Sequence, residues 1–299
     1  MSLSNLPPDV LRTAPGRHPW SNRRRSVWPV LLLIAGLLAV AACGLAIDLK
    51  VSREIYERRG LGVLHPSLEV VRGFGDAVGV LLIGLLIYTL DYTRRPNLPR
   101  MTTIALAAGG MVDVLKLLIC RVRPHHSDLT GSVYSTFEGW LPGLSAGSNG
   151  QSFPSGHTAT AIGLALGLSW LYPRGRTMFV ALAVLVGLQR VEAGAHYLSD
   201  VLCGAAIGVA CALVCFRGPY MGRFFARLER WLRLNLQARL NRRFAAYAAG
   251  RSNVPVRIPG IVAEDLYGAT ARVAEAAGSR ARSATEAHAD QLHIANSAA

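Results

Sequence analysis

Lysine is almost absent from this sequence: all but two of its 32 basic residues are arginine, and the exceptions are Lys50 and Lys116. Charged residues of both signs make up only 17% of the 299 residues, whereas hydrophobic residues make up 51%, with a mean hydropathy of +0.31. This balance is typical of a membrane protein. A nucleic-acid-binding protein could share the formal charge of +14, but its basic residues would form one face of a soluble fold. Here they lie between apolar segments, which argues against that class.

Cysteine is also scarce, and its positions argue against a cysteine-ligated metal site and against a disulfide-stabilised fold. The five cysteines lie in or beside apolar runs and lack the spacing of metal ligands, so we interpret them as packing residues without a disulfide framework. Carboxylates form no cluster that suggests a magnesium site. His125 and His126 are adjacent, but no matching ligands accompany them. We therefore expect neither a metal nor a cofactor.

Six apolar runs are long enough, or nearly so, to cross a bilayer, which takes about 20 residues of helix. They predict an all-α fold, a polytopic bundle of six transmembrane helices. The first run also imitates a secretory or lipoprotein signal that ends at Cys43, but its long leader and its continuation past Cys43 favour an uncleaved helix. The runs cover residues 27–47, 76–90, 101–119, 157–172, 177–194 and 196–216.

Arginines are distributed unevenly around these runs. With six spans, four arginine-rich segments lie on one side of the membrane, and the positive-inside rule makes that side cytoplasmic. Both termini are then cytoplasmic, and the long 120–156 segment faces outward. The 48–75 segment, on the outer side, also carries arginines and dilutes the asymmetry. The four segments are residues 21–26, 91–100, 172–176 and the tail after Phe216.

These observations divide the chain into four parts. The basic segment 1–26 is expected in the cytoplasm, and 27–216 forms the membrane domain. Segment 217–247 combines arginines with apolar residues and predicts an amphipathic helix on the anionic inner leaflet, although a helix that packs on the spans would show a similar pattern. Segment 248–299, rich in alanine, serine and charge, is expected to be a flexible tail.

Ionisable residues inside apolar runs are costly and are therefore functional candidates. Lys116 stands near the end of the third run, and Arg123 follows seven residues later. On a continuing helix the two side chains would lie on one face, until Pro124 stops the helix. Two cations would then point the same way at the outer interface. Alternatively, Lys116 pairs with Asp113 or extends to the interface.

A second polar group lies in the stretch QRVEAGAHYLSD, residues 189–200. His196 and Asp200 are four residues apart, so on a helix the carboxylate can accept the proton of one ring nitrogen. The other nitrogen then presents its lone pair, as in a nucleophile or a base. Alternatively, Asp200 caps the helix or pairs with Arg190.

The third group is PSGH, residues 154–157, at the head of an apolar run. Ser155 is a preferred cap residue, and Gly156 permits close backbone approach. Free N–H groups at a helix start form an anion site. A cap explains the serine and the glycine, but it does not explain His157. The three groups together supply three cations, an anion-binding helix start and two histidines, which are the components of phosphoryl transfer without a metal.

These stretches resemble the three-part signature of the type 2 phosphatidic acid phosphatase (PAP2) superfamily, KxxxxxxRP, PSGH and SRxxxxxHxxxD, which read here KLLICRVRP, PSGH and QRVEAGAHYLSD. The resemblance covers roughly residues 76–216 and implies the helical bundle of the PAP2/haloperoxidase-like type. It implies that His196 is the nucleophile, that Asp200 orients it, and that His157 is the general acid and later the base. Gln189 stands where the family has serine. The implied phosphate-binding residues are Lys116, Arg123, Arg190, Ser155 and Gly156.

The resemblance implies a metal-independent phosphatase that acts on a lipid phosphate or diphosphate through a phosphohistidine. Candidate substrates are phosphatidic acid, phosphatidylglycerophosphate and a polyprenyl diphosphate such as undecaprenyl diphosphate. The expected location is a bacterial inner membrane, with the active site facing the periplasm or the exterior. Tyr134, Phe137 and Trp140 of the outer loop could dip into the interface. A lipid phosphotransferase and a non-catalytic lipid-binding protein are the alternatives; the spans argue against a haloperoxidase.

Overall fold

The computed structural model describes residues 26–57, 65–141 and 151–248. The chain forms two compact units, of which the larger contains every element that positions the candidate site. The larger unit comprises residues 15–88 and 94–232, and the smaller one residues 1–14, 89–93 and 233–299.

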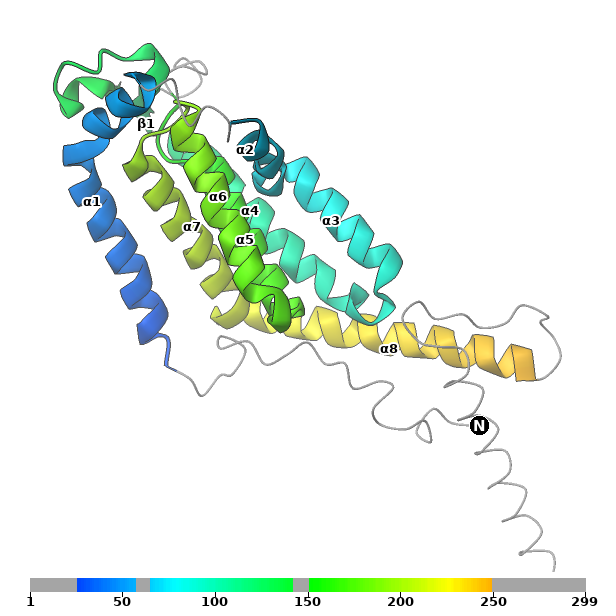
Figure 1. Cartoon of the computed structure of the whole chain (residues 1–299). Helices are drawn as coiled ribbons and strands as arrows, with labels where there is room; N and C mark the ends of the chain where they lie inside the picture. Colours follow the sequence, from blue (N-terminus) through cyan, green and yellow to red (C-terminus); the bar gives the residue numbers. More distant parts are fainter. Residues whose placement is uncertain (1–25, 58–64, 142–150, 249–299) are drawn as a thin grey trace, which may run out of the picture. The chain divides into compact units, whose positions relative to one another are not determined.

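The larger unit is built on six long helices, each of which coincides within a few residues with a predicted apolar run, apart from an extension of the first. Helix α5 packs against α4, α6 and α7, and α1 packs along α7 (Figure 1). The mostly helical fold was therefore predicted correctly. The helices are α1 (Trp28–Glu57), α3 (Ala77–Leu90), α4 (Leu98–Lys116), α5 (Gly156–Leu171), α6 (Arg176–Glu192) and α7 (Leu198–Arg217).

The number of membrane spans differs from the prediction of six. Among the described residues, three helical stretches are long and apolar enough to cross a membrane: Trp28–Glu57, Tyr92–Lys116 and Leu198–Arg217. A fourth is added if the pair Glu69–Gly75 and Ala77–Leu90, which is bent by 75°, forms one broken span. Helices α5 and α6 have only 16 and 17 residues, short of the roughly 20 that a straight span requires. Length and composition thus support three or four spans.

Helix α5 lies at the centre of the bundle because small residues let its neighbours approach. A Cβ atom on Gly163 would lie 3.0 Å from the Cα of Ala105 in α4, so the two backbones are nearly in contact. Met101 and Ile104 of α4 and Leu164 of α5 have no exposed surface in this interface. Close packing of this kind makes α5 a rigid support for the residues at its first turn.

A two-stranded sheet interrupts the helical pattern after α4. Strand β1 (Ile119–Arg121) pairs antiparallel with β2 (Phe137–Trp140), and the pairing shifts register between Cys120 and Arg121. The prediction that a helix continues from Lys116 to Arg123 is therefore wrong, because α4 ends at Lys116. The extended backbone allows the side chain of Arg121 to enter the bundle, where it meets two buried carboxylates.

A short bent segment precedes α3. Helix α2 (His65–Arg72) packs on α6, and the 3₁₀ turn η3 (Gly73–Gly75) packs on α5. Asp76 follows directly and adopts an extended backbone conformation. The segment therefore delivers Asp76 to the end of the bundle at which α5 begins.

Helix α8 (Met221–Ala248) follows α7. Its residues up to Leu232 belong to the larger unit, where Phe225 and Glu229 are buried. The Glu229 carboxylate lies 2.8 Å from Nε of Arg100 in α4. One side of this helix therefore packs on the bundle, while Phe224 and Trp231 remain exposed.

Candidate active site

The PSGH stretch forms the start of α5, as the sequence predicted. Ser155 is the N-cap residue, Gly156 begins the helix, and His157 lies in its first turn. The Ser155 side chain makes no capping hydrogen bond; its hydroxyl lies 2.9 Å from that of Thr158, and its backbone N–H donates to the carbonyl of Asp200. These bonds fix the start of α5 against the start of α7.

His196 lies outside any helix, two residues before α7 begins. Its Nδ1 is 2.6 Å from the backbone carbonyl oxygen of Ser152 and 3.9 Å from Oδ2 of Asp200. The second distance is too long for a hydrogen bond. A carbonyl can only accept, so Nδ1 carries the proton and Nε2 presents its lone pair. The expected tautomer is obtained, but the partner that fixes it is Ser152.

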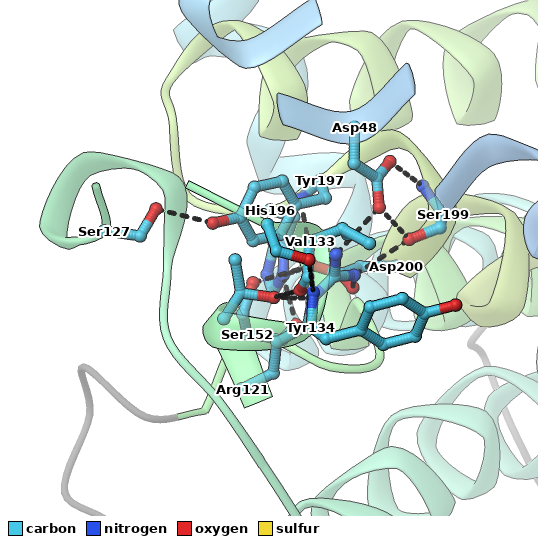
Figure 2. A network of polar contacts seen from close by, with 12 residues as sticks. Asp48, Arg121, Ser127, Val133, Tyr134, Ser152, His196, Tyr197, Ser199 and Asp200 are labelled. Atoms are coloured by element: carbon cyan, nitrogen blue, oxygen red, sulfur yellow. Dashed lines mark hydrogen bonds and ion pairs between the residues drawn. The ribbon is translucent and has the colours of Figure 1, made fainter. Parts of the chain in front are cut away.

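Asp200 is completely buried near the start of α7 and acts on Ser152 (Figure 2). Its Oδ2 accepts a 2.6 Å hydrogen bond from the Ser152 hydroxyl and a 2.9 Å bond from the backbone N–H of Tyr197. Capping of α7, which the sequence left open as an alternative, is thus one of its roles. Asp200 supports His196 through Ser152, which binds the carboxylate with its hydroxyl and the imidazole with its carbonyl.

Arg121, which sequence reasoning did not single out, holds this network together (Figure 2). Its guanidinium has no exposed surface, lies 2.8 Å from Oδ2 of Asp48 in α1, and forms an ion pair with Asp200. It also donates to the Ser199 hydroxyl at 2.8 Å. Buried charges are costly unless they are fully paired. Asp48 and Asp200 pair with the buried guanidinium, and these ion pairs connect α1, β1 and α7 close to His196.

Two predicted phosphate ligands, Lys116 and Arg123, interact electrostatically with His196. The Nζ atom of Lys116 is 3.8 Å from Asp113, as the alternative reading expected, and a Cβ atom on Gly156 would lie 3.9 Å from the same Nζ. The Nε atom of Arg123 is buried and has no hydrogen-bond partner among the residues that the structure describes. A buried donor without a partner costs about 1–3 kcal/mol. Arg123 is therefore prepared to bind an oxygen ligand.

Arg190, the third predicted cation, is buried in the last turn of α6. Its Nε donates to Oε1 of Gln189 at 2.7 Å, and Nε2 of Gln189 donates to Oε1 of Glu69 at 2.6 Å. The glutamine at the position of the family serine therefore connects Arg190 to α2. Arg190 and His196 both interact electrostatically with His157, and Lys116 and Arg123 interact with His196, so the three signature stretches converge.

Burial dominates the electrostatics of His196. It lowers the pKa of the imidazole below its ordinary value of 6.5, because the charged form loses its solvation, and Lys116 and Arg123 add to this effect. Asp200 acts in the opposite direction. The ring is therefore neutral at neutral pH, the protonation state that a nucleophile requires. Within residues 26–57, 65–141 and 151–248, no group of three histidine, cysteine or carboxylate side chains is arranged to hold a metal ion.

Comparison with known proteins gives two relatives that are both lipid A 1-phosphatases. This chain is 32% identical to the Rhizobium etli protein over 157 residues, covering 47% of this chain and 65% of the relative. It is 31% identical to the Rhizobium johnstonii protein over 163 residues, covering 49% and 64%. The chain thus spans slightly less than two thirds of these relatives.

This chain also matches a solved phosphatase structure and the model of one protein family. The PAP2 type phosphatidylglycerolphosphate phosphatase from Bacillus subtilis matches with a TM-score of 0.43 and 22% identity, covering 62% of this chain and 92% of that one. The model of the PAP2 superfamily matches residues 98–223, a segment that contains Lys116, Arg123, PSGH and His196. The segment from residue 98 to residue 223 therefore belongs to the PAP2 superfamily.

Proposed function

We propose that this protein is a membrane phosphatase that hydrolyses a lipid phosphate or diphosphate through a phosphohistidine at His196, without a metal. One observation carries the proposal. Nδ1 of His196 donates to the carbonyl of Ser152, so the lone pair of Nε2 is free, and the buried Nε of Arg123 is without a partner within the described part of the chain. A neutral nucleophile next to an unsatisfied cation is suited to attack phosphorus.

The reaction has two steps. In the first, Nε2 of His196 forms a bond to phosphorus while the bond to the lipid oxygen breaks, and His157 gives its proton to that oxygen. In the second, His157 takes a proton from water, the water oxygen attacks phosphorus, and the phosphorus–nitrogen bond breaks. Inorganic phosphate leaves, and both histidines return to their starting protonation states. The phosphate-binding residues are Lys116, Arg123 and Arg190, with Ser155 and the Gly156 amide at the start of α5.

A lipid is the favoured substrate class because the chain is rich in apolar helices and its relatives are lipid phosphatases by name. The names of the relatives add a lipid A 1-phosphate to the three candidate lipids. Tyr134 and Trp140, both 79% exposed, are suited to the membrane interface. Phe137 differs, because its ring packs 4.8 Å from the guanidinium carbon of Arg121. Interfacial contact therefore rests on Tyr134 and Trp140.

The proposed location of the protein is a bacterial inner membrane. If all six helices cross the membrane, the positive-inside rule puts both termini in the cytoplasm and the site toward the periplasm or the exterior. The exposed Phe224 and Trp231 of α8 accompany Arg227 and Arg230 in the same stretch. This combination is suited to an anionic inner leaflet, while Phe225 packs on the bundle.

The test is phosphate release by detergent-purified protein from a panel of lipid monophosphates and diphosphates, with EDTA present. We expect release by the wild type and by Asp128→Asn, a control in an exposed loop, and a loss of at least about a hundredfold in His196→Ala. Transfer to an added lipid acceptor in place of water would favour the phosphotransferase. Folded wild-type protein that binds these lipids but neither releases nor transfers phosphate would contradict the proposal and favour a lipid-binding protein.

A further inference from the structure

We propose that Asp76 is a positioning residue for His157, whose ring it holds at Nε2 so that Nδ1 exchanges the proton with the leaving oxygen and then with water. This inference rests on the proposed function, because it assigns the support of its general acid. His196 already has a support in Ser152. His157 has a different one, supplied by a part of the chain outside the three signature stretches.

The side chains of Asp76 and His157 lie at ion-pair distance. Oδ1 of Asp76 lies 2.8 Å from Nε2 of His157. The two atoms are at ion-pair distance, but their alignment gives Nε2 no hydrogen bond among the described residues. We assign a hydrogen to Nε2 because a carboxylate at this distance favours an N–H directed toward it, and Nδ1 is then the nitrogen that gains and loses a proton. The side chains are 28% and 39% exposed, so the pair lies at an accessible edge of the site.

The fold brings the two residues together through a glycine. A Cβ atom on Gly75 would lie 2.6 Å from the backbone carbonyl oxygen of His157, closer than any side chain tolerates. Glycine therefore lets η3 lie directly against the first turn of α5. The bend of 75° between the helical segments on either side of Asp76 then places this residue beside the imidazole.

A helix cap is the simpler explanation of an aspartate at this point, because Asp is a preferred N-cap residue. The backbone carbonyl of Asp76 does accept from the N–H of Val80 in α3. The side chain, however, has its two oxygens at His157 and near Nε of Arg72, the latter at 3.9 Å. Its position is therefore set by the site.

Burial and the surrounding charges explain why His157 needs a carboxylate. Burial is the largest effect that opposes a positive charge on the ring, and Arg190 from α6, His196 and Arg72 from α2 add to it, whereas Asp76 favours the charge. Lys116 from α4 adds another cation at the same helix start. A ring surrounded by cations that bind phosphate is poorly able to hold the proton that it must donate. Asp76 compensates for these cations at the nitrogen remote from the substrate.

The test compares Asp76→Asn and Asp76→Glu with the wild type, with Asp128→Asn as the control for the same chemical change on an exposed loop. We expect Asp76→Asn to lower kcat about tenfold with KM within about twofold of the wild-type value. We also expect the alkaline limb of the kcat profile to move to lower pH, because the uncharged amide no longer favours the protonated ring. Asp76→Glu should restore part of kcat and the position of the limb. An unchanged limb in Asp76→Asn, at any level of activity, would overturn the proposal.

A second readout does not depend on turnover. In protein with ¹⁵N-labelled histidine, the ring resonances of His157, assigned with His157→Ala, should titrate at lower pH in Asp76→Asn than in the wild type. Identical titrations would overturn the pairing. If the wild type hydrolyses no lipid phosphate while this difference is observed, the proposed function fails and the pairing of Asp76 with His157 stands.

Discussion

Nδ1 of His196 and Oδ2 of Asp200 lie 3.9 Å apart, and Ser152 connects the two residues by binding both. The carboxylate therefore orients the imidazole through a neighbouring loop residue. This arrangement places the support of His196 on the loop that leads into α5, so the geometry of the PSGH stretch and of the nucleophile are set together.

The first prediction concerns this indirect contact. Ser152→Ala removes the hydroxyl that binds Asp200 and leaves the backbone carbonyl less firmly held, so we expect kcat to fall about tenfold. Asp200→Asn disturbs Arg121, Ser152 and the start of α7 at once and should cost at least about a hundredfold. Steady-state kinetics on the best lipid of the panel measures both. Wild-type kcat in Ser152→Ala would show that Asp200 acts on His196 without this link.

The second prediction concerns stability. Arg121→Met leaves Asp48 and Asp200 buried without their cation, and breaking a buried ion pair in this way costs about 3–5 kcal/mol. We expect a markedly lower midpoint of thermal unfolding in detergent. Arg174→Met, the same change at an exposed position in the connection between α5 and α6, should alter stability by less than about 0.5 kcal/mol. Equal midpoints for the two variants would contradict the structural role of Arg121.

The third prediction concerns the protonation of His196. Because burial lowers its pKa, the imidazole should titrate below 6.5 in the folded protein. The protonated ring cannot attack phosphorus, so this group permits activity down to a pH below 6.5 and limits it only at lower pH. The folded state binds this proton less tightly than the unfolded state, so the stability contributed by the neutral ring is lost as pH falls from about 6.5 through the folded-state pKa. Titration of ¹⁵N-labelled protein, assigned with His196→Ala, measures the value; a midpoint above 6.5 would contradict it.

The fourth prediction concerns the choice of lysine at position 116. The Nζ atom lies beside the backbone of Gly156, where a planar guanidinium would be crowded against the start of α5. Lys116→Arg keeps the charge but should lose most activity, at least about tenfold in kcat/KM. Lys50→Arg, which changes the other lysine of the chain, serves as the control. Near-normal turnover by Lys116→Arg would remove this account of the position.

Patterns of neighbouring residues predicted the helices correctly. The apolar runs located the six helices, and the cap residue before a histidine located the start of α5. The hairpin was missed because its first strand, Ile119–Arg121, has only three residues, too few to show the alternation of apolar and polar residues that marks a strand. The apolar sequence of α4 also continues into this strand without an intervening polar turn. The predicted helical neighbours His196 and Asp200 failed for a similar reason, since α7 begins only at Leu198.

The buried network was missed because its partners are distant in sequence. Arg121 pairs with Asp48, 73 residues away, and Gln189 with Glu69, 120 residues away, and no spacing rule connects such positions. One signal was available in α1. Ala41, Gly44, Asp48 and Ser52 are buried and recur every three or four residues, so they form one face of the helix. Had the predicted helix been extended past Ile47, Asp48 would have been identified as an ionisable residue on the helix face that packs on a neighbour.

The central claim is that His196 becomes covalently phosphorylated. The most direct measurement is mass spectrometry of the protein quenched at alkaline pH during turnover of a lipid phosphate, with His157→Ala included because it slows attack by water on the intermediate. We predict a phosphoryl group on the peptide that carries His196, more abundant in His157→Ala than in the wild type and absent from His196→Ala. Sustained phosphate release by the wild type, with no phosphorylated His196 in either protein and undiminished release by His196→Ala, would contradict the account.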